Sequence, residues 1–186
     1  MIYNNLLNKA VSKLTTRGAL QYVHQAPDGG EFVASDGIVM LVENTGTPFL
    51  AALWSSQTQT PVDCADEYPD WRRVLSDGIK NAKKLFRADR ISVQDGFAII
   101  GGLYTSATKY QLVRDFIGSD IVVYVPNSVG YPIYFRNADE SRQALIMPYN
   151  IRKDTKFEVL NTSGEVVYTT ADIREAEMFN LTVRVA

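Results

Sequence analysis

Apolar residues recur at helical spacing between residues 5 and 15, which predicts an amphipathic first helix that ends near Gly18. Its apolar stripe consists of Leu6, Leu7, Ala10, Val11 and Leu14. The same periodicity predicts a second helix over 78–88 and a third over 108–117. Their buried faces would be Ile79, Ala82, Leu85 and Phe86 in the second helix, and Tyr110, Val113, Phe116 and Ile117 in the third.

Short runs of strand-forming residues fill most of the chain between these helices, and clusters of Gly, Asp, Asn and Pro separate them. The predicted strands are 19–25, 31–35, 38–43, 90–94, 97–104, 121–125, 131–136 and 143–148, with a further candidate at 49–54. Residues 55–69 show no clear period, and most of the stretch 44–70 is predicted to be loop. The order of elements predicts an α+β fold of antiparallel sheets with two or three helices.

The last stretch has a different character. Two strand-like runs, 157–160 and 165–169, flank an Asn-Thr-Ser-Gly turn and predict a hairpin. A short helix from about Ala171 follows, with Asp172 and Glu175 at capping-box spacing, and then a strand over 181–185. We therefore predict a main domain over 1–151 and a C-terminal hairpin-helix-strand extension over 152–186.

Composition narrows the class of protein. With 186 residues, 46% of them hydrophobic and 22% charged, the chain can bury one substantial core. It has no run of eighteen apolar residues and no signal-peptide pattern at its start, so we expect a cytoplasmic protein without a membrane partner. Cys64 is the only cysteine and His24 the only histidine, which excludes intrachain disulfides and cysteine-based zinc sites.

Catalytic motifs are absent from the sequence. It contains no phosphate-binding loop, no dinucleotide fingerprint, no nucleophile elbow and no His-Glu zinc-protease pair, so we expect a protein that is not an enzyme and needs no cofactor. An acidic cluster could suggest magnesium, but it lacks an accompanying phosphate-binding loop, and a solvated loop is the preferred interpretation. The cluster consists of Asp63, Asp66, Glu67 and Asp70.

The charge pattern provides one candidate binding surface. Four cations of the second predicted helix, Lys80, Lys83, Lys84 and Arg87, recur at i, i+3, i+4 and i+7, so they would share one face. Such a face can neutralise DNA phosphates without reading bases, although an ordinary solvated helix face has the same pattern. The first predicted helix would add Lys9, Lys13 and Arg17.

Arg72 and Arg73 are further candidates for DNA contact. One guanidinium could reach a phosphate while the other pairs with Asp70 or Glu67, and a purely structural role is equally compatible with the pattern.

Three segments resemble the sliding clamp of bacteria, the beta subunit of the replicative polymerase, and they occur in the order of that family. Residues 32–37 read Phe-Val-Ala-Ser-Asp-Gly and resemble a clamp strand that ends in an Ala-Thr-Asp-Gly turn. Residues 68–75, Tyr-Pro-Asp-Trp-Arg-Arg-Val-Leu, are similar to the family's Phe-Pro-Asp-Tyr-Arg-Arg-Val segment. Residues 109–116 resemble its late helix, and the strands up to Met147 and Pro148 resemble its closing strands.

The resemblance implies a clamp-like fold, sequence-independent binding of duplex DNA, and assembly into a homo-oligomeric ring. It also implies that peptides from a DNA polymerase or clamp loader bind in an apolar pocket near the C-terminal strand, at the positions of Met147, Pro148 and Tyr149. The chain departs from the family in three respects: it has about half the usual length, it continues beyond the Met-Pro strand, and it has Ile38 where an imidazole is common.

Three hypotheses follow. The first is a short processivity factor, encoded by a phage or mobile element, whose subunits associate into a closed ring and tether a polymerase to DNA through basic helices. The second is a clamp-mimicking interaction module that binds a replication partner without encircling DNA. The third, a phage structural or assembly protein, would require the three matches to be coincidental.

Overall fold

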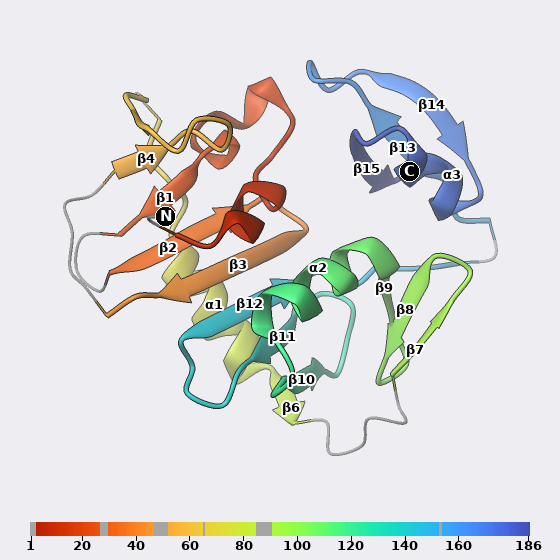
Figure 1. Cartoon of the computed structure of the whole chain (residues 1–186). Coiled ribbons are helices and arrows are strands. Elements are labelled where there is room, and N and C mark those ends of the chain that lie inside the picture. Colours follow the sequence, from red (N-terminus) through yellow and green to blue (C-terminus); the bar gives the residue numbers. More distant parts are fainter. Residues whose placement is uncertain (1–2, 27–29, 47–51, 65, 85–90, 153) are drawn as a thin grey trace.

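The computed structural model describes residues 3–26, 30–46, 52–64, 66–84, 91–152 and 154–186. Over these residues the fold is α+β and all strand pairs are antiparallel, which confirms the predicted class (Figure 1). The main sheet has, among the described residues, nine strands in the order β5-β4-β1-β2-β3-β12-β11-β10-β6. These strands are β1 (Val23–Gln25), β2 (Glu31–Ser35), β3 (Val39–Asn44), β4 (Ala52–Trp54), β5 (Pro61–Val62), β6 (Ala82–Lys84), β10 (Val122–Pro126), β11 (Ile133–Arg136) and β12 (Arg142–Ile146).

The pairing of β3 with β12 joins the two halves of the main sheet. It runs without a break from the pair Glu43 and Arg142 to the pair Val39 and Ile146. Side chains alternate across β3, so that Leu41 points to one face of the sheet and its neighbours in sequence point to the other. Because both faces bury apolar side chains, each face needs a covering layer.

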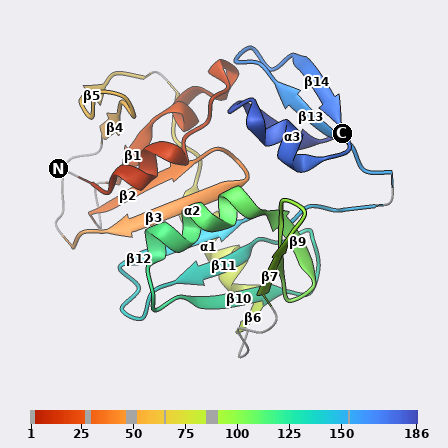
Figure 2. The same cartoon turned by 45° about the vertical axis from the view of Figure 1, so that its right-hand side comes forward.

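Two α-helices cover opposite faces of the main sheet. Helix α2 (Ala107–Ile117) packs Val113 and Phe116 against the face that holds Leu41. Helix α1 (Trp71–Lys80) packs Trp71 and Leu75 against the other face. Figure 1 shows α2 in front of the sheet and α1 behind it, and Figure 2 gives a second view of the same layers. The two helices therefore do not form one common helical surface.

Two further three-stranded sheets complete the described part of the chain. One consists of β7 (Ile91–Gln94), β8 (Phe97–Ile100) and β9 (Leu103–Ser106). The other has the order β14-β13-β15, and helix α3 packs on it. Its elements are β13 (Phe157–Leu160), β14 (Val166–Thr170), α3 (Ile173–Met178) and β15 (Thr182–Val185). We call these four elements the C-terminal unit. They have the predicted order of hairpin, helix and strand.

The C-terminal unit shares its hydrophobic core with the rest of the chain. Phe157 and Ile173 of the unit lie in one cluster with Tyr149, and Phe97 of β8 packs against it. The ring centroids of Phe97 and Phe157 are 5.9 Å apart, as are those of Tyr149 and Phe157. The boundary at residue 151 stays a prediction, but apolar contacts cross it.

The single α-helix predicted at 5–15 is wrong. The structure has two 3₁₀ helices, η1 (Asn5–Lys9) and η2 (Thr15–Gln21). The backbone N–H of Ser12 donates to the carbonyl of Leu20 at 2.8 Å, so it is not available for an i to i−4 bond. The predicted stripe is nevertheless partly correct, because Leu7, Ala10 and Leu14 are buried.

The helix predicted at 78–88 is also wrong, because α1 begins seven residues earlier. Asp70 starts α1 by accepting the backbone N–H of Arg73 at its Oδ1 atom, at 3.1 Å. Asn81 follows the helix, and its Nδ2 atom donates to the carbonyl of Asp77 at 2.8 Å. The buried stripe is Trp71, Leu75 and Gly78, whereas Ile79 is 42% exposed.

The basic helical face disappears with that correction. Lys80 is the last residue of α1, while Lys83 and Lys84 belong to β6 and pair with β10. Arg87 lies outside the described residues. The third helix is confirmed with a shift of one residue at its start. The candidate strand at 49–54 is confirmed over β4, and its remaining residues lie outside the described ranges.

Gly96 tests how closely the β7-β8 turn packs on the C-terminal unit. Its φ is +81°, and an added Cβ would stand 2.6 Å from Arg174 Cγ and 2.7 Å from Ile173 Cγ2. Because Ile173 is fully buried, it cannot move away freely. We expect Gly96→Ala to lower the free energy of unfolding by about 2 to 4 kcal/mol, from left-handed strain plus overlap. Chemical denaturation would measure this loss.

Gly102→Ala is the matched control, since Gly102 lies in the next turn of the same sheet with a φ of +89° and no atom within 4 Å of an added Cβ. It should lose only the strain, about 1 to 2 kcal/mol. Equal losses for the two variants would mean that the turn does not pack on α3 as described.

Candidate functional site

An apolar pocket of about 220 Å³ lies between α1, the main sheet and the turn that joins β2 to β3. The three segments that resemble sliding clamps meet there, although they are far apart in the sequence. The first contributes Ser35 and Gly37, the second contributes Tyr68, Pro69, Trp71 and Val74, and the third contributes Pro132, Leu145 and Met147. Leu20, Ile38, Val39 and Met40 complete the lining.

The turn over residues 35–39, which we call the wall turn, is held by its own side chains. Asp36 accepts the backbone N–H groups of Ile38 and Val39 at its Oδ1 atom, both at 2.9 Å. Ser35 accepts the N–H of Gly37 and donates to the carbonyl of Val39. Gly37 has a φ of +90°, which favours glycine at this position. The Asp-Gly pair thus shapes one side of the pocket.

Helix α1 supplies another side of the pocket. Trp71 is 7% exposed and contributes to the pocket lining, whereas Val74 is 48% exposed at the same pocket. Arg72 places its guanidinium carbon 4.8 Å from the centre of the Trp71 ring and pairs with Glu31 at 3.0 Å. These contacts fix the helix relative to β2 and leave an apolar side chain partly open to solvent.

Tyr68 brings a polar atom to this apolar region. Its hydroxyl is buried and makes no hydrogen bond of ordinary length with the described residues. Burial raises the pKa of the Tyr68 phenol, and the backbone of Ser35 opposes part of that rise. His24 stacks on the phenol ring with centroids 4.6 Å apart. Burial and then the nearby Arg72 lower the pKa of His24, so its neutral form is favoured.

The three consecutive residues proposed from the sequence for peptide binding do not all line the apolar pocket. Met147 is half-buried and lines the pocket, and its backbone N–H donates to the carbonyl of Ile38 at 2.8 Å. Tyr149 instead belongs to the cluster shared with the C-terminal unit. Pro148 lies between them and is buried. Of these three residues, Met147 alone contributes to the pocket lining.

The cations proposed for DNA contact are distributed over two regions. Arg72, Arg73, Lys80, Lys83 and Lys84 follow one another along α1 and β6, and all are exposed. The two arginines are already paired: Arg72 with Glu31, and Arg73 with Asp77 at 4.0 Å. The predicted partners Asp70 and Glu67 are therefore wrong, because neither arginine forms an ion pair with them.

The remaining three cations lie near the N-terminus of the chain. Lys9 is exposed at the end of η1. Lys13 donates from Nζ to the carbonyl oxygen of Asn180 at 2.7 Å, so it binds the C-terminal unit. Arg17 lies over Gly37, where an added Cβ would stand 3.1 Å from its Nη1 atom. Lys13 and Arg17 thus contact other parts of the chain.

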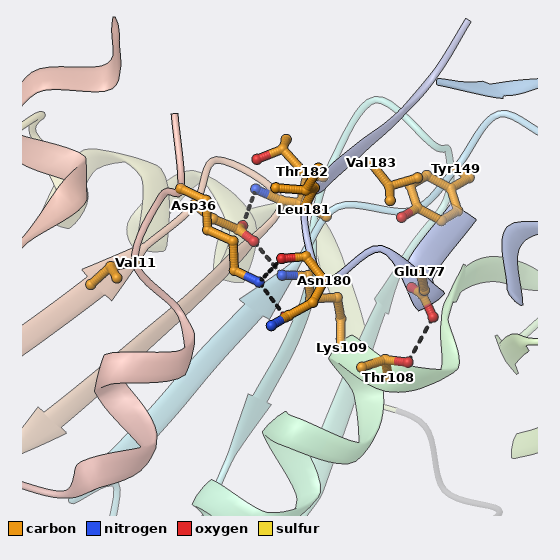
Figure 3. Close-up of a pocket in the computed structure, with 12 residues that line it drawn as sticks. Val11, Asp36, Thr108, Lys109, Tyr149, Glu177, Asn180, Leu181, Thr182 and Val183 are labelled. Atoms are coloured by element: carbon orange, nitrogen blue, oxygen red, sulfur yellow. Dashed lines mark hydrogen bonds and ion pairs between the residues drawn. The ribbon is translucent and has the colours of Figure 1, made fainter. Parts of the chain in front are cut away.

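A second hollow, which we call the mixed cleft, lies on the other side of the wall turn, between α2 and the C-terminal unit (Figure 3). Lys109 of α2 pairs with Asp36 inside it. Glu177 of α3 accepts the hydroxyl of Thr108 at 2.6 Å. Partial burial and then Lys109 lower the pKa of Lys13 at its margin. Sequence reasoning missed this cleft because its residues come from five segments that lie far apart in the chain.

The described residues contain no group of three or more His, Cys, Asp or Glu side chains placed to hold a metal ion. Of the predicted acidic cluster, Asp70 caps α1. Among the described helices, none is long and apolar enough to cross a membrane.

No protein-family model matches this chain, and no curated protein matches it. Solved structures do match. The DNA polymerase sliding clamp from Pseudomonas aeruginosa matches with a TM-score of 0.55 and 13% sequence identity, over 79% of this chain and 64% of that chain. The clamp from Caulobacter crescentus matches with a TM-score of 0.51 and 17% identity, over 80% of this chain and 64% of that chain.

The beta clamp of Helicobacter pylori, solved bound to a DNA ligase peptide, matches with a TM-score of 0.52 and 9% identity, over 78% of this chain and 61% of that chain. This chain thus spans less than two thirds of the length of these clamps. The structural similarity establishes the fold, and sequence identities this low do not establish the activity. The chain is an α+β protein whose fold matches that of the bacterial DNA sliding clamps.

Proposed function

We propose that this chain is a clamp-like interaction module of DNA replication, which binds a short apolar segment of a partner protein in the apolar pocket. The observation that carries the proposal is the convergence of the three clamp-like segments on that pocket. The partner would be a DNA polymerase, a clamp loader or another replication enzyme. We infer that the chain itself contributes no bond chemistry.

The size and lining of the pocket support a peptide as its occupant. Its volume of about 220 Å³ is smaller than the range of about 300 to 1,000 Å³ typical of sites for drug-sized ligands and cofactors. Of its lining residues, Ser35, Tyr68 and Trp71 have a polar group in their side chains, and the others are apolar or glycine. A hollow of this kind suits one or two apolar side chains, with the rest of the segment lying outside.

The affinity of such a site would be modest. Burial of two leucine-sized side chains contributes about 3 to 6 kcal/mol in total. Ordering the peptide opposes part of this gain. A short isolated peptide should therefore bind with a dissociation constant on the order of 1 mM, and a longer partner could add contacts outside the pocket.

Val74 provides the direct test, because it lines the pocket and is 48% exposed, so its replacement should leave the fold intact. We expect Val74→Lys to weaken binding of the capped peptide Ser-Leu-Gly-Leu-Ser by about five- to tenfold, since an ammonium group at the pocket would have to be desolvated. Chemical-shift titration at millimolar peptide would measure this. The peptide Ser-Asn-Gly-Asn-Ser, similar in size and polar, should not bind.

Ile79→Lys is the matched control. Ile79 is 42% exposed on the same helix and does not line the pocket, so this variant should bind the leucine peptide like the unchanged protein. If both lysine variants lose binding equally, or if the unchanged protein does not distinguish leucine from asparagine, the pocket does not bind apolar segments.

Tethering to duplex DNA is a second candidate function, supported by the charge of residues 71–84. This segment contains five cations and one carboxylate, Asp77, and its lysines are exposed. Because these cations lie on α1 and β6 and not on one helical face, they support DNA binding less strongly than the sequence pattern implied. Encirclement of the duplex would also require several copies of the chain to close into a ring.

Charge reversal tests this role. We expect the double variant Lys80→Glu/Lys83→Glu to weaken binding of a random-sequence duplex and to reduce the slope of log affinity against log salt by about 2, because each lost phosphate contact contributes about 0.9. Fluorescence anisotropy of a labelled duplex over a salt series would measure both. Binding of the leucine peptide should not change.

Arg152→Glu/Lys156→Glu makes the same change in net charge at exposed positions outside that segment. It should leave the salt slope unchanged. Retention on circular but not linearised DNA would support encirclement, whereas a monomer that is indifferent to DNA topology would exclude it.

A further inference from the structure

The wall turn separates two hollows with different chemistry. Ser35, Gly37 and Val39 face the apolar pocket, Asp36 faces the mixed cleft, and Ile38 lines both. The C-terminal unit forms the opposite side of the mixed cleft through Glu177 and residues 180–183 (Figure 3). The C-terminal unit and the wall turn therefore border the same cleft.

A continuous series of polar contacts links Glu177 to the wall turn. Glu177 accepts hydrogen bonds from Ser106 and Thr108, which lie at the start of α2. Ser106 is also the N-cap of α2 and accepts the backbone N–H of Lys109 at 3.1 Å. The carboxylate is well placed electrostatically, because helix N-termini favour negative charge.

The next contact in this series is an ion pair. Lys109 pairs with one carboxylate oxygen of Asp36, and the other oxygen binds the N–H groups of Ile38 and Val39. The Lys109 and Asp36 side chains are 25% and 14% exposed, so water screens the pair only in part. Lys109 thus restrains the carboxylate that holds the turn.

A second contact of the C-terminal unit adds to this restraint. Lys13 donates to the carbonyl oxygen of Asn180, which has a φ of +50°, and Lys13 interacts electrostatically with both Asp36 and Lys109. The cleft then contains two cations, Lys13 and Lys109, and two carboxylates, Asp36 and Glu177. Glu177 is the negative charge that the C-terminal unit supplies to this balance.

We propose that the C-terminal unit is a brace for the peptide pocket: Glu177 and Lys109 act as positioning residues that hold the wall turn in the conformation that binds the apolar segment. The part of this proposal that concerns peptide affinity rests on the proposed function. The part that concerns the order of the wall turn does not.

Amide hydrogen exchange at Ile38 and Val39 tests the brace directly, because Asp36 accepts both N–H groups. In Glu177→Gln we expect both amides to exchange about five- to tenfold faster, the effect of losing about 1 kcal/mol from a charge-assisted contact. The amide of the buried Ala144 in β12 reports global opening and should not change. Affinity for the Ser-Leu-Gly-Leu-Ser peptide should fall in parallel by about threefold, which is a weaker coupling than the roughly fivefold or more that is typical between two sites.

Glu175→Gln is the matched control. Glu175 lies on the same helix, but its carboxylate accepts the hydroxyl of Thr170 within the C-terminal unit. This variant should leave the exchange of Ile38 and Val39 unchanged. If Glu177→Gln destabilises the whole protein, Thr108→Val removes one hydrogen bond to Glu177 at an exposed position and should give the same effect at smaller size.

The two readouts separate failure of the brace from failure of the proposed function. Unchanged exchange at Ile38 and Val39 in both Glu177→Gln and Thr108→Val would overturn the brace, whatever the peptide does. If the variants exchange faster but the unchanged protein does not bind the peptide, the brace is supported and its role in peptide affinity is overturned. Faster exchange with unaltered peptide affinity would also overturn that role.

Discussion

The pairing of β3 with β12 is the constraint on which the rest of this structure depends. It brings residues 39–43 into register with residues 142–146, about a hundred positions later in the chain. It thereby joins β1 to β5 to the strands β11, β10 and β6 in one sheet. Because side chains alternate across it, the same pairing buries Leu41 under α2 and Met40 under α1.

The apolar pocket is a consequence of this pairing. Val39 and Met40 come from β3, Leu145 from β12, and Met147 from the residues that follow β12. A shift of one residue in register would turn Leu145 to the opposite face and remove it from the pocket. The segments that resemble sliding clamps therefore become a site only when this long-range pairing forms.

Local patterns in the sequence were sufficient for the elements whose partners are close in the chain. Helix α2 has a continuous apolar stripe, a serine N-cap and a glycine stop, and its position was predicted within one residue. The hairpin of β13 and β14 was predicted from its Asn-Thr-Ser-Gly turn. In both cases the residues that decide the structure lie within one segment.

The errors arose where distant contacts decide between alternatives. Residues 79–86 have a helical pattern, yet Asn81 ends α1, and β6 pairs with β10 about forty residues later. The first helix is interrupted because Ser12 bonds to the carbonyl of Leu20. The mixed cleft could not be predicted for the same reason, since Asp36, Lys109 and Glu177 meet only in the folded chain.

The core of the C-terminal unit explains why this unit can influence a pocket that it does not line. A three-stranded sheet with one short helix buries too little apolar surface to be very stable alone. The unit gains core contacts from Phe97 and Tyr149, which belong to the rest of the chain. Tyr149 lies two residues after Met147, a lining residue of the pocket. The proposed brace thus has an apolar route through Tyr149 in addition to the polar contacts through Glu177.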